Sequence, residues 1–165
     1  MAGMEESTTM KALVNVKLEF VDTTLEILQQ AGKECREGAV LWLAQAQGSV
    51  TTVQQVFVPI QDATDDYFRI PREGITALLR QLRTARLQVA VQVHSHPCEA
   101  FHSPADDTWA IIRHAGALSL VVPYFGRRTT TDTFTQDTVV YELCFNNQWC
   151  HIPATEVSRH YQVHA

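Results

Sequence analysis

The segment His94-Ser95-His96-Pro97 carries the residue types best suited to chemistry. Residues i and i+2 of a β-strand project from one face, so the imidazoles of His94 and His96 can converge on one ion. Downstream, Ser103 and Asp106 have the spacing of a helix N-cap and its third residue, which places a carboxylate in the first helical turn. Two histidines and one aspartate leave a fourth position open on tetrahedral zinc, as in catalytic rather than structural sites.

The full pattern is far more specific than its parts. Seven histidines in 165 residues give roughly 0.3 His-x-His pairs by chance. Requiring the following Pro97 and a nearby Ser-x-x-Asp lowers the chance expectation to roughly 1 in 10,000. The alternative interpretation is a pair of surface histidines beside a turn.

With this motif the chain resembles the JAB/MPN-type (JAMM) zinc metalloproteases. That family combines an upstream glutamate with His-x-His-Pro and Ser-x-x-Asp, matched here by HSHP at 94–97 and SPAD at 103–106. The resemblance covers residues ~12–160. It looks closest to short bacterial JAB proteins encoded beside E1-like and E2-like ubiquitin-conjugation proteins, a likeness carried by VHSHPCEAFHSPADD and GALSLVVPYFG.

The family's glutamate opens a strand, in a pattern similar to Glu-x-x-Gly-Leu-x-x-Gly. Glu37 fits this place, although Val40 and Ala44 stand where small glycines are usual. Glu34, three residues earlier in the preceding loop, is the alternative. The resemblance therefore points to Glu37 as the general base, with Glu34 kept open.

Two criteria conflict over the third metal ligand. The Ser-x-x-Asp spacing selects Asp106, whereas the family's usual distance of eleven residues after His96 selects Asp107. Adjacent helical residues point about 100° apart, so only one of them is expected to bind the metal. We favour Asp106, because Ser103 and Pro104 fix the start of the helix while a loop can vary in length.

The resemblance also implies a reaction. One Zn²⁺ per chain would be held by His94, His96 and Asp106, while Glu37 would take a proton from water and return it to the leaving amine. Ser103 would hydrogen-bond the developing oxyanion. The implied substrate is a ubiquitin-like protein joined through its C-terminus to a lysine or a following peptide. Implied partners are conjugates of that protein and E1-like and E2-like proteins, in a bacterial antiphage defence system.

Three other classes compete with this interpretation. A non-catalytic MPN-type scaffold would keep the fold and lack the metal. A cytidine-deaminase-type zinc site needs Pro-Cys-x-x-Cys, and no second cysteine follows Cys98 at that spacing. A cysteine peptidase would have to pair Cys98 with His96 or His102, and groups this close in sequence seldom form such a pair.

Composition places these residues in a globular chain. The 165 residues are 45% hydrophobic and 19% charged with a net charge of −5, so we expect one domain over 1–165, flexible at 1–10, and no nucleic-acid partner. No apolar stretch reaches the roughly 20 residues of a membrane span, and the first residues lack signal-peptide features. We therefore expect a cytoplasmic protein with no membrane partner and with reduced cysteines.

The expected elements form an α/β (α+β) layered fold: a mixed central β-sheet flanked by helices, as the JAB/MPN resemblance also implies. Alternation predicts a strand over 14–20 and one over 87–95 whose four apolar residues share a face. A capping box at Thr23 and Glu26 predicts a helix that Gly32 ends. Further expected elements are hairpins over 38–58 and 139–152, helices over 72–86, 103–115 and from about 154, a strand over 118–122, and a polar loop or edge strand over 129–138.

Basic residues gather near one of these helices. Arg69, Arg72, Arg80, Arg83 and Arg86 fall within eighteen positions. A solvated helix face is one interpretation, and a docking patch for an acidic partner is the other.

Overall fold

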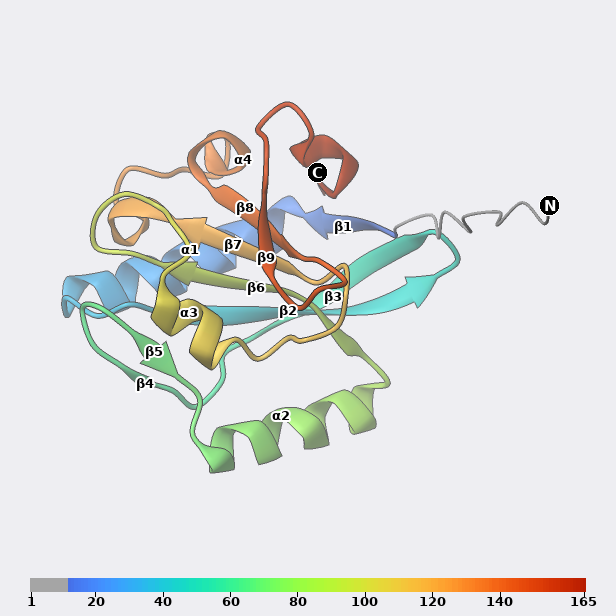
Figure 1. Cartoon of the computed structure of the whole chain (residues 1–165), viewed down its shortest axis with the longest axis horizontal. Helices are drawn as coiled ribbons and strands as arrows, with labels where there is room; N and C mark the ends of the chain where they lie inside the picture. Colours follow the sequence, from blue (N-terminus) through green and yellow to red (C-terminus); the bar gives the residue numbers. More distant parts are fainter. Residues whose placement is uncertain (1–11) are drawn as a thin grey trace.

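The computed structural model describes residues 12–165 and has a mixed α+β architecture with helices on both sides of a curled sheet (Figure 1). The sheet contains β1 (Leu13–Lys17), β2 (Ala39–Gln47), β3 (Val50–Phe57), β6 (Gln88–Ser95), β7 (Leu118–Val122), β8 (Val139–Leu143), β9 (Trp149–Ile152) and β10 (Tyr161–His164). Their order is β10-β1-β3-β2-β6-β7-β8-β9, and β4 (Asp62–Ala63) pairs separately with β5 (Phe68–Arg69). The helices are α1 (Leu18–Lys33), α2 (Arg72–Ala85), α3 (Pro104–Trp109) and α4 (Phe134–Asp137), with 3-10 turns η1 (Pro123–Gly126) and η2 (Val157–Arg159). The predicted layered fold class is confirmed, whereas the expected flexible segment 1–10 lies outside the described residues.

Parallel and antiparallel pairs mix within the sheet. β1 runs parallel to β10 and β3, β6 runs parallel to β7, and the remaining neighbours are antiparallel. A parallel pair needs a crossover connection, and the β6–β7 crossover contains α3. The HSHP segment and the Ser-x-x-Asp segment therefore lie together beyond the carboxyl end of β6.

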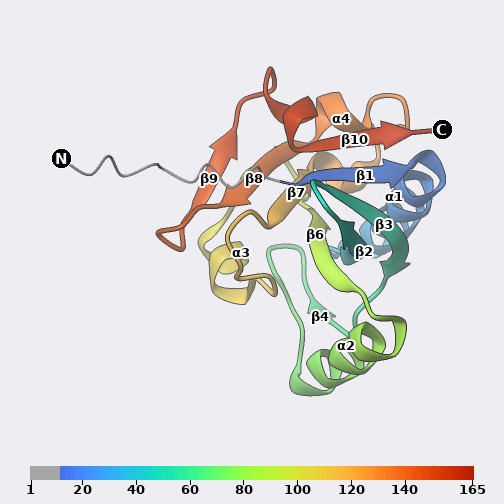
Figure 2. The same cartoon turned by 90° about the vertical axis from the view of Figure 1, so that its right-hand side faces the viewer.

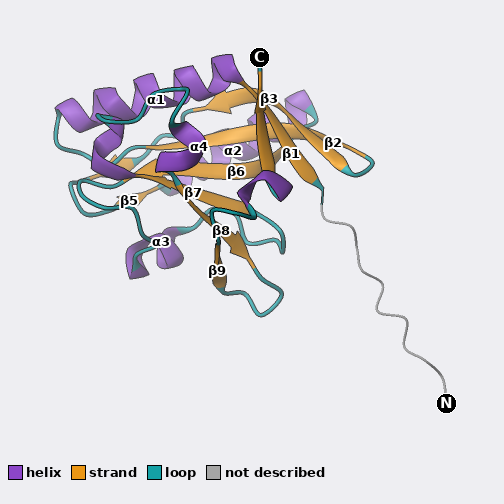
Figure 3. Ribbon diagram, turned by 90° about the horizontal axis from the view of Figure 1, so that it is seen from above, coloured by secondary structure: helices purple, strands orange, loops and turns teal. Residues whose placement is uncertain are grey.

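The two faces of β2 pack against different helices. Trp42 is fully buried on the α1 side, where its indole Nε1 donates to Thr24 Oγ1 at 2.9 Å. Leu41 and Leu43 point to the other face and pack against Leu78 of α2. Figures 2 and 3 show α1 and α3 on opposite sides of the sheet. Burial of each large apolar side chain contributes roughly 2 kcal/mol, so both faces hold the sheet in place.

The first strand is shorter than its alternation predicts. β1 ends at Lys17, and α1 begins immediately afterwards. The apolar residues that follow recur at helical spacing and give α1 a buried stripe of Val21, Leu25 and Leu28. The predicted capping box is wrong, because Thr23 lies inside α1 and its hydroxyl donates to the Glu19 carbonyl. Gly32 also lies inside the helix rather than ending it.

A β-bulge divides the predicted apolar face of β6. Trp42 pairs with Val91, but the next residue of β2, Leu43, pairs with Val89, so Ala90 is the extra residue. One extra residue reverses the alternation beyond it. Val91 therefore packs in the core beside α1, whereas Val89 packs against the clusters on the opposite face.

Three other expected elements differ in the structure. α3 stops at Trp109 rather than near Ala115, because the chain is extended from Ala110 and the Ile111 N–H donates to Gln92 Oε1. The expected terminal helix is replaced by η2 and by β10, which pairs with β1. Of the two alternatives for residues 129–138, the edge strand is wrong: the segment forms turns and the short α4, which buries Phe134 in the core.

The cysteines divide into two kinds. Cys144 and Cys150 form a disulfide across the β8–β9 hairpin, which corrects the expectation that all four are reduced. Cys35 and Cys98 are free and exposed. The hairpin itself, around Asn146 and Asn147, is as predicted.

Gly32 provides a stability test of the contact between α1 and η1. A Cβ on Gly32 would lie 2.4 Å from Phe125 Cβ. Phe125 has little room to move, because it is buried and its N–H donates to the His96 carbonyl at 2.7 Å. We expect Gly32→Ala to destabilise the fold by about 1–3 kcal/mol through overpacking, which is measured by thermal melting. Gly48→Ala is the control: its Cβ meets nothing within 4 Å, and only its φ of +62° costs about 1 kcal/mol. Equal melting temperatures for the two variants would contradict the predicted close contact.

Candidate metal centre and active site

His94 and His96 lie at the carboxyl end of β6, and both are buried. The intervening Ser95 points the other way: its Oγ accepts from the Gly38 N–H at 3.0 Å, and its own N–H donates to the Gly38 carbonyl at 3.0 Å. The His96 N–H donates to the Val122 carbonyl at 2.9 Å. These bonds to β2 and β7 hold the two histidines on one face, as the i, i+2 spacing predicts.

Asp106 reaches the histidines from α3. Ser103 is the N-cap of α3, its Oγ accepts from the Asp106 N–H at 3.1 Å, and its N–H donates to Asp106 Oδ2 at 2.7 Å. This reciprocal capping box, with Pro104 in the first helical position, fixes the direction of the Asp106 carboxylate. Asp107 instead is 58% exposed in its side chain and pairs with Arg113 at 3.6 Å.

One carboxylate oxygen faces both imidazoles. Asp106 Oδ2 lies 3.2 Å from His94 Nε2 and 3.1 Å from His96 Nε2, and the ligand atoms of the three residues all lie within 4.8 Å of one another. In the fully buried His94, Nδ1 has no hydrogen-bond partner within the described chain, and Nε2 faces the Asp106 carboxylate. A buried polar atom without a partner is costly unless a ligand satisfies it. Two imidazoles and one carboxylate are a donor set that fits a divalent metal such as Zn²⁺.

The electrostatics of Asp106 agree with this arrangement. Burial alone would raise the pKa of the Asp106 carboxyl, but His94, His96 and the Ser103 N–H favour its ionised form. The net result is a pKa below its usual range. Asp106 is therefore ionised at neutral pH, which is the state that a metal ligand requires.

Glu37 is the second carboxyl group of this cluster. It lies in the connection between α1 and β2, is 2% exposed, and its Oε1 is 4.0 Å from His96 Nε2. Its backbone N–H donates to the Thr64 carbonyl at 2.6 Å, and its Oε2 has no partner within the described residues. Burial first, and then repulsion by Asp106 and by two aspartates of the β4–β5 turn, raise the pKa of Glu37 to about 8. A raised carboxyl pKa near neutral pH suits a group that must both take up and release a proton.

The alternative glutamate lies elsewhere. Glu34 is exposed and pairs with Arg36, whereas Glu37 points its carboxyl toward the histidines. Of the sequence-predicted residues, the structure brings together His94, His96, Asp106, Ser103 and Glu37. Asp107 and Glu34 remain outside the group.

The sequence does not predict the aromatic rings that pack beside the histidines. The ring of Phe68 in β5 is 1% exposed and lies 5.2 Å from that of His94, and the half-exposed Phe101 stands edge-on to His96 at 4.7 Å. The His102 ring lies 5.1 Å from the rings of both Tyr141 and Trp149. Burial lowers the pKa of His102 to about 4, so this histidine is neutral. No local sequence signal connects β5 or the β8–β9 hairpin to the motif, because these contacts form only in the folded chain.

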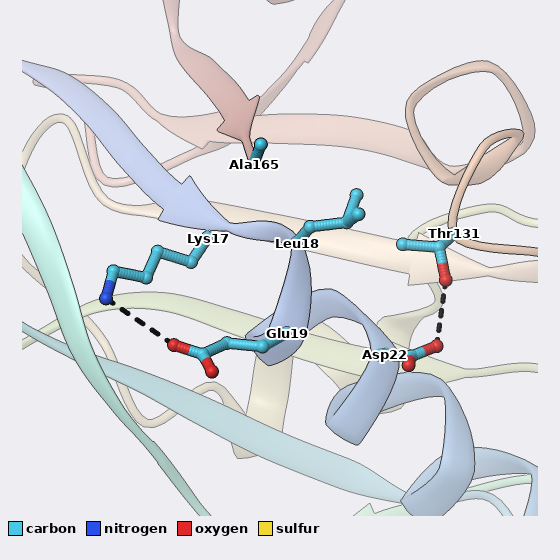
Figure 4. A pocket seen from close by; sticks show the side chains of 6 residues that line it. All are labelled: Lys17, Leu18, Glu19, Asp22, Thr131 and Ala165. Atoms are coloured by element: carbon cyan, nitrogen blue, oxygen red, sulfur yellow. Dashed lines mark hydrogen bonds and ion pairs between the residues drawn. The ribbon is translucent and has the colours of Figure 1, made fainter.

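Two hollows differ in their relation to this centre. One of about 340 Å³ is lined by Asp66, Tyr67 and Arg69 together with Ala105, the residue before Asp106. The other, of about 510 Å³, lies at the start of α1, where Lys17 pairs with Glu19 and Thr131 bonds Asp22 (Figure 4). Neither hollow is lined by a predicted site residue, but the smaller one includes Ala105, the neighbour of Asp106, so we place the chemistry nearer to it.

The chain is similar over nearly its whole length to a protein described as a probable metalloprotease. No protein-family model matches the chain. The probable metalloprotease y4jG of Sinorhizobium fredii is 29% identical over 163 residues, which cover 96% of each chain. Together with the His94–His96–Asp106 group, this similarity fits a metal-dependent peptidase.

A solved structure supports the fold. The solution structure of protein DSY2949 from Desulfitobacterium hafniense matches with a TM-score of 0.64 and 16% identity, covering 92% of this chain and 93% of that chain. At this identity the likeness concerns the fold alone. Within residues 12–165, no helix has the length and apolar character needed to cross a membrane.

Proposed function

We propose that this protein is a zinc-dependent peptidase of the JAMM type, which hydrolyses the bond after the C-terminus of a ubiquitin-like protein. The observation that carries the proposal is the buried group of His94, His96 and Asp106 with Glu37 beside it. One Zn²⁺ per chain would be held by the two imidazoles and the Asp106 carboxylate. When bound, zinc polarises a carbonyl and lowers the pKa of water toward about 7.

Glu37 supplies the proton transfer. Its Oε1 lies 4.0 Å from His96 Nε2, so a water held among these groups is within reach of the carboxylate. Glu37 takes the proton of that water as it attacks the carbonyl and passes it to the leaving amine. Its raised pKa favours this return of the proton.

Ser103 has two tasks in this proposal. Its Oγ accepts from the Asp106 N–H, which orients the metal-binding carboxylate. The hydroxyl proton is not used in that bond, so it is free to stabilise the developing oxyanion.

The substrate is the finer part of the proposal. The resemblance to bacterial JAB proteins favours a ubiquitin-like protein and its conjugates, with E1-like and E2-like partners, in the cytoplasm of a cell that uses this conjugation for antiphage defence. In this proposal a chain end would approach the centre from the hollow that Ala105 lines. A non-catalytic MPN-type scaffold is disfavoured, because a scaffold gains nothing from burying Glu37 next to Asp106 at an electrostatic cost.

Metal analysis and cleavage assays test the proposal together. We expect about one zinc per chain in untagged protein, cleavage of ubiquitin-like proteins carrying a C-terminal peptide, loss of cleavage with 1,10-phenanthroline and recovery with zinc. His94→Ala/His96→Ala should lose both metal and cleavage. The matched control His151→Ala/His164→Ala removes two exposed histidines and should keep both. Protein that takes up no zinc and cleaves nothing would support the scaffold instead.

A further inference from the structure

The outer face of α2 carries arginines that the proposed function does not use. α2 turns Gly74 and Leu78 toward the rest of the fold and exposes Arg72, Arg80 and Arg83 to solvent. At 100° per residue these three arginines fall within an arc of about 80° on the side away from the buried residues. They are called the arginine stripe below, and Figure 1 shows α2 at the lower edge of the molecule.

The arginine stripe has no acidic partner within residues 12–165, although the chain has 18 acidic residues and a net charge of −5. Three arginines outside α2 pair with acidic residues: Arg36 with Glu34, Arg69 with Asp62 and Arg113 with Asp107. α2 therefore concentrates positive charge on one face, and Glu73 is the single acidic residue of the helix.

Two positions within the stripe oppose helix stability. Arg72 is in the first turn of α2, where the helix dipole disfavours a cation, and the N-cap Pro71 gives no side-chain cap. Arg80 and Arg83 are three residues apart, a spacing at which like charges repel. Glu73 in the first turn and Arg83 in the last turn do suit the helix dipole, so the unfavourable placements are Arg72 and the Arg80–Arg83 pair. A partner that supplies negative charge would relieve both.

The stripe starts close to the candidate centre. α2 follows β5 after two residues, and Arg69 of β5 lines the same hollow as Ala105 of α3. From Arg72 to Arg83 the helix rises about 16 Å, so the stripe leads away from the site along the surface. A folded partner lying on α2 would have its chain end or a loop within reach of the hollow.

We infer that the arginine stripe is a docking surface for an acidic folded protein, held there while its scissile bond is presented to the metal centre. The purpose of docking rests on the proposed peptidase function, but the binding itself does not. All basic residues of the stripe are arginine, whose planar guanidinium binds carboxylates in pairs of hydrogen bonds. The half-exposed Leu79 lies at the edge of the same arc and adds an apolar contact typical of protein interfaces.

Charge and apolar area favour a protein over the other anionic partners. A nucleic acid extends beyond a patch of this length and would meet the acidic remainder of a chain whose net charge is −5. An anionic membrane needs an apolar helix face to insert, and the apolar face of α2 is turned toward β2. A protein with a local cluster of carboxylates satisfies the stripe without either conflict.

Binding of a fluorescent 20-residue polyglutamate peptide to the full chain tests this inference. We expect salt-sensitive binding that weakens at least about 10-fold in Arg72→Gln/Arg80→Gln/Arg83→Gln, because the three guanidinium contacts are lost. The matched control, Lys33→Gln/Arg128→Gln/Arg159→Gln, removes the same charge at exposed sites outside α2 and should weaken binding less than about 2-fold. Melting curves should show that the triple arginine variant is at least as stable as wild type, because it relieves repulsion in α2.

Three outcomes would overturn the docking surface. One is equal loss in the stripe variant and the control, and another is no polyglutamate binding at low salt. The third is tighter, stripe-dependent binding of a 20-nucleotide RNA or of phosphatidylserine vesicles, which would assign the stripe to another class of partner. The same titration with His94→Ala/His96→Ala protein separates the two proposals, since docking should survive the loss of the metal centre. Failure of cleavage with intact binding would contradict only the proposed peptidase.

Discussion

Replacing Asp106 by asparagine will reduce zinc affinity by at least about 100-fold and peptidase activity by about 1,000-fold or more. The carboxylate is the only anionic member of the group, and its Oδ2 faces both His94 Nε2 and His96 Nε2. An amide in its place keeps the size of the side chain but removes the charge that balances a divalent cation. Elemental analysis and the cleavage assay described above measure the two losses.

Asp107→Asn is the matched control for this substitution. Asp107 has an exposed side chain paired with Arg113, an interaction worth about 0–1 kcal/mol, so zinc content and activity should stay within about 3-fold of wild type. Circular dichroism of both metal-free variants will show whether α3 still forms. If Asp107→Asn loses the metal and Asp106→Asn keeps it, the third ligand is assigned to the wrong residue.

Which of the two neighbouring carboxylates, Asp106 or Asp107, faces the histidines could be predicted, because it depends on local chemistry. Ser103 and Pro104 define the first residues of α3, and the capping box then fixes which carboxylate turns toward the N-cap. The distance along the loop from His96 carries no comparable constraint. The preference for Glu37 over Glu34 instead depends on the family resemblance, which places a glutamate just before the buried strand β2.

Other features could not be predicted, because they depend on contacts between distant segments. The bulge at Ala90 arises from the pairing of β6 with β2, and no property of the β6 sequence reveals it. The same holds for β10, which forms because it pairs with β1. The neutral His102 depends on Tyr141 and Trp149, which lie about forty residues away in the chain.

Glu37→Gln will lower kcat by about 100- to 10,000-fold while the protein still binds one zinc per chain. Glutamine keeps the shape of the side chain but cannot carry a proton from water to the leaving amine. Glu34→Gln, an exposed glutamate paired with Arg36, is the control and should retain wild-type activity. Loss of zinc in Glu37→Gln would instead place this residue among the ligands.

The same substitution has the opposite effect on the stability of the metal-free protein. The pKa of Glu37 is raised from 4.5 to about 8 in the fold, by burial first and then by repulsion from Asp106, Asp66 and Asp65. Below pH 4.5 both folded and unfolded chains hold the proton, so Glu37 costs nothing. Between pH 4.5 and 8 the unfolded chain releases it and the folded chain does not, so stability falls as pH rises.

Glutamine has no proton to lose, so metal-free Glu37→Gln should unfold at the same denaturant concentration as wild type near pH 4 and at a higher one at pH 8. The shift corresponds to at most about 5 kcal/mol, and relaxation of the site should reduce the gain to roughly 1–3 kcal/mol. Adding zinc should shrink the difference, because a cation beside Glu37 favours its ionised form. Denaturant melts from pH 4 to 9 measure this gain, and a gain that is independent of pH would mean that Glu37 is already ionised in the metal-free fold. A pH-dependent gain that zinc removes would identify the burial of Glu37, with the repulsion from neighbouring carboxyl groups, as a cost in stability that the protein retains for its metal chemistry.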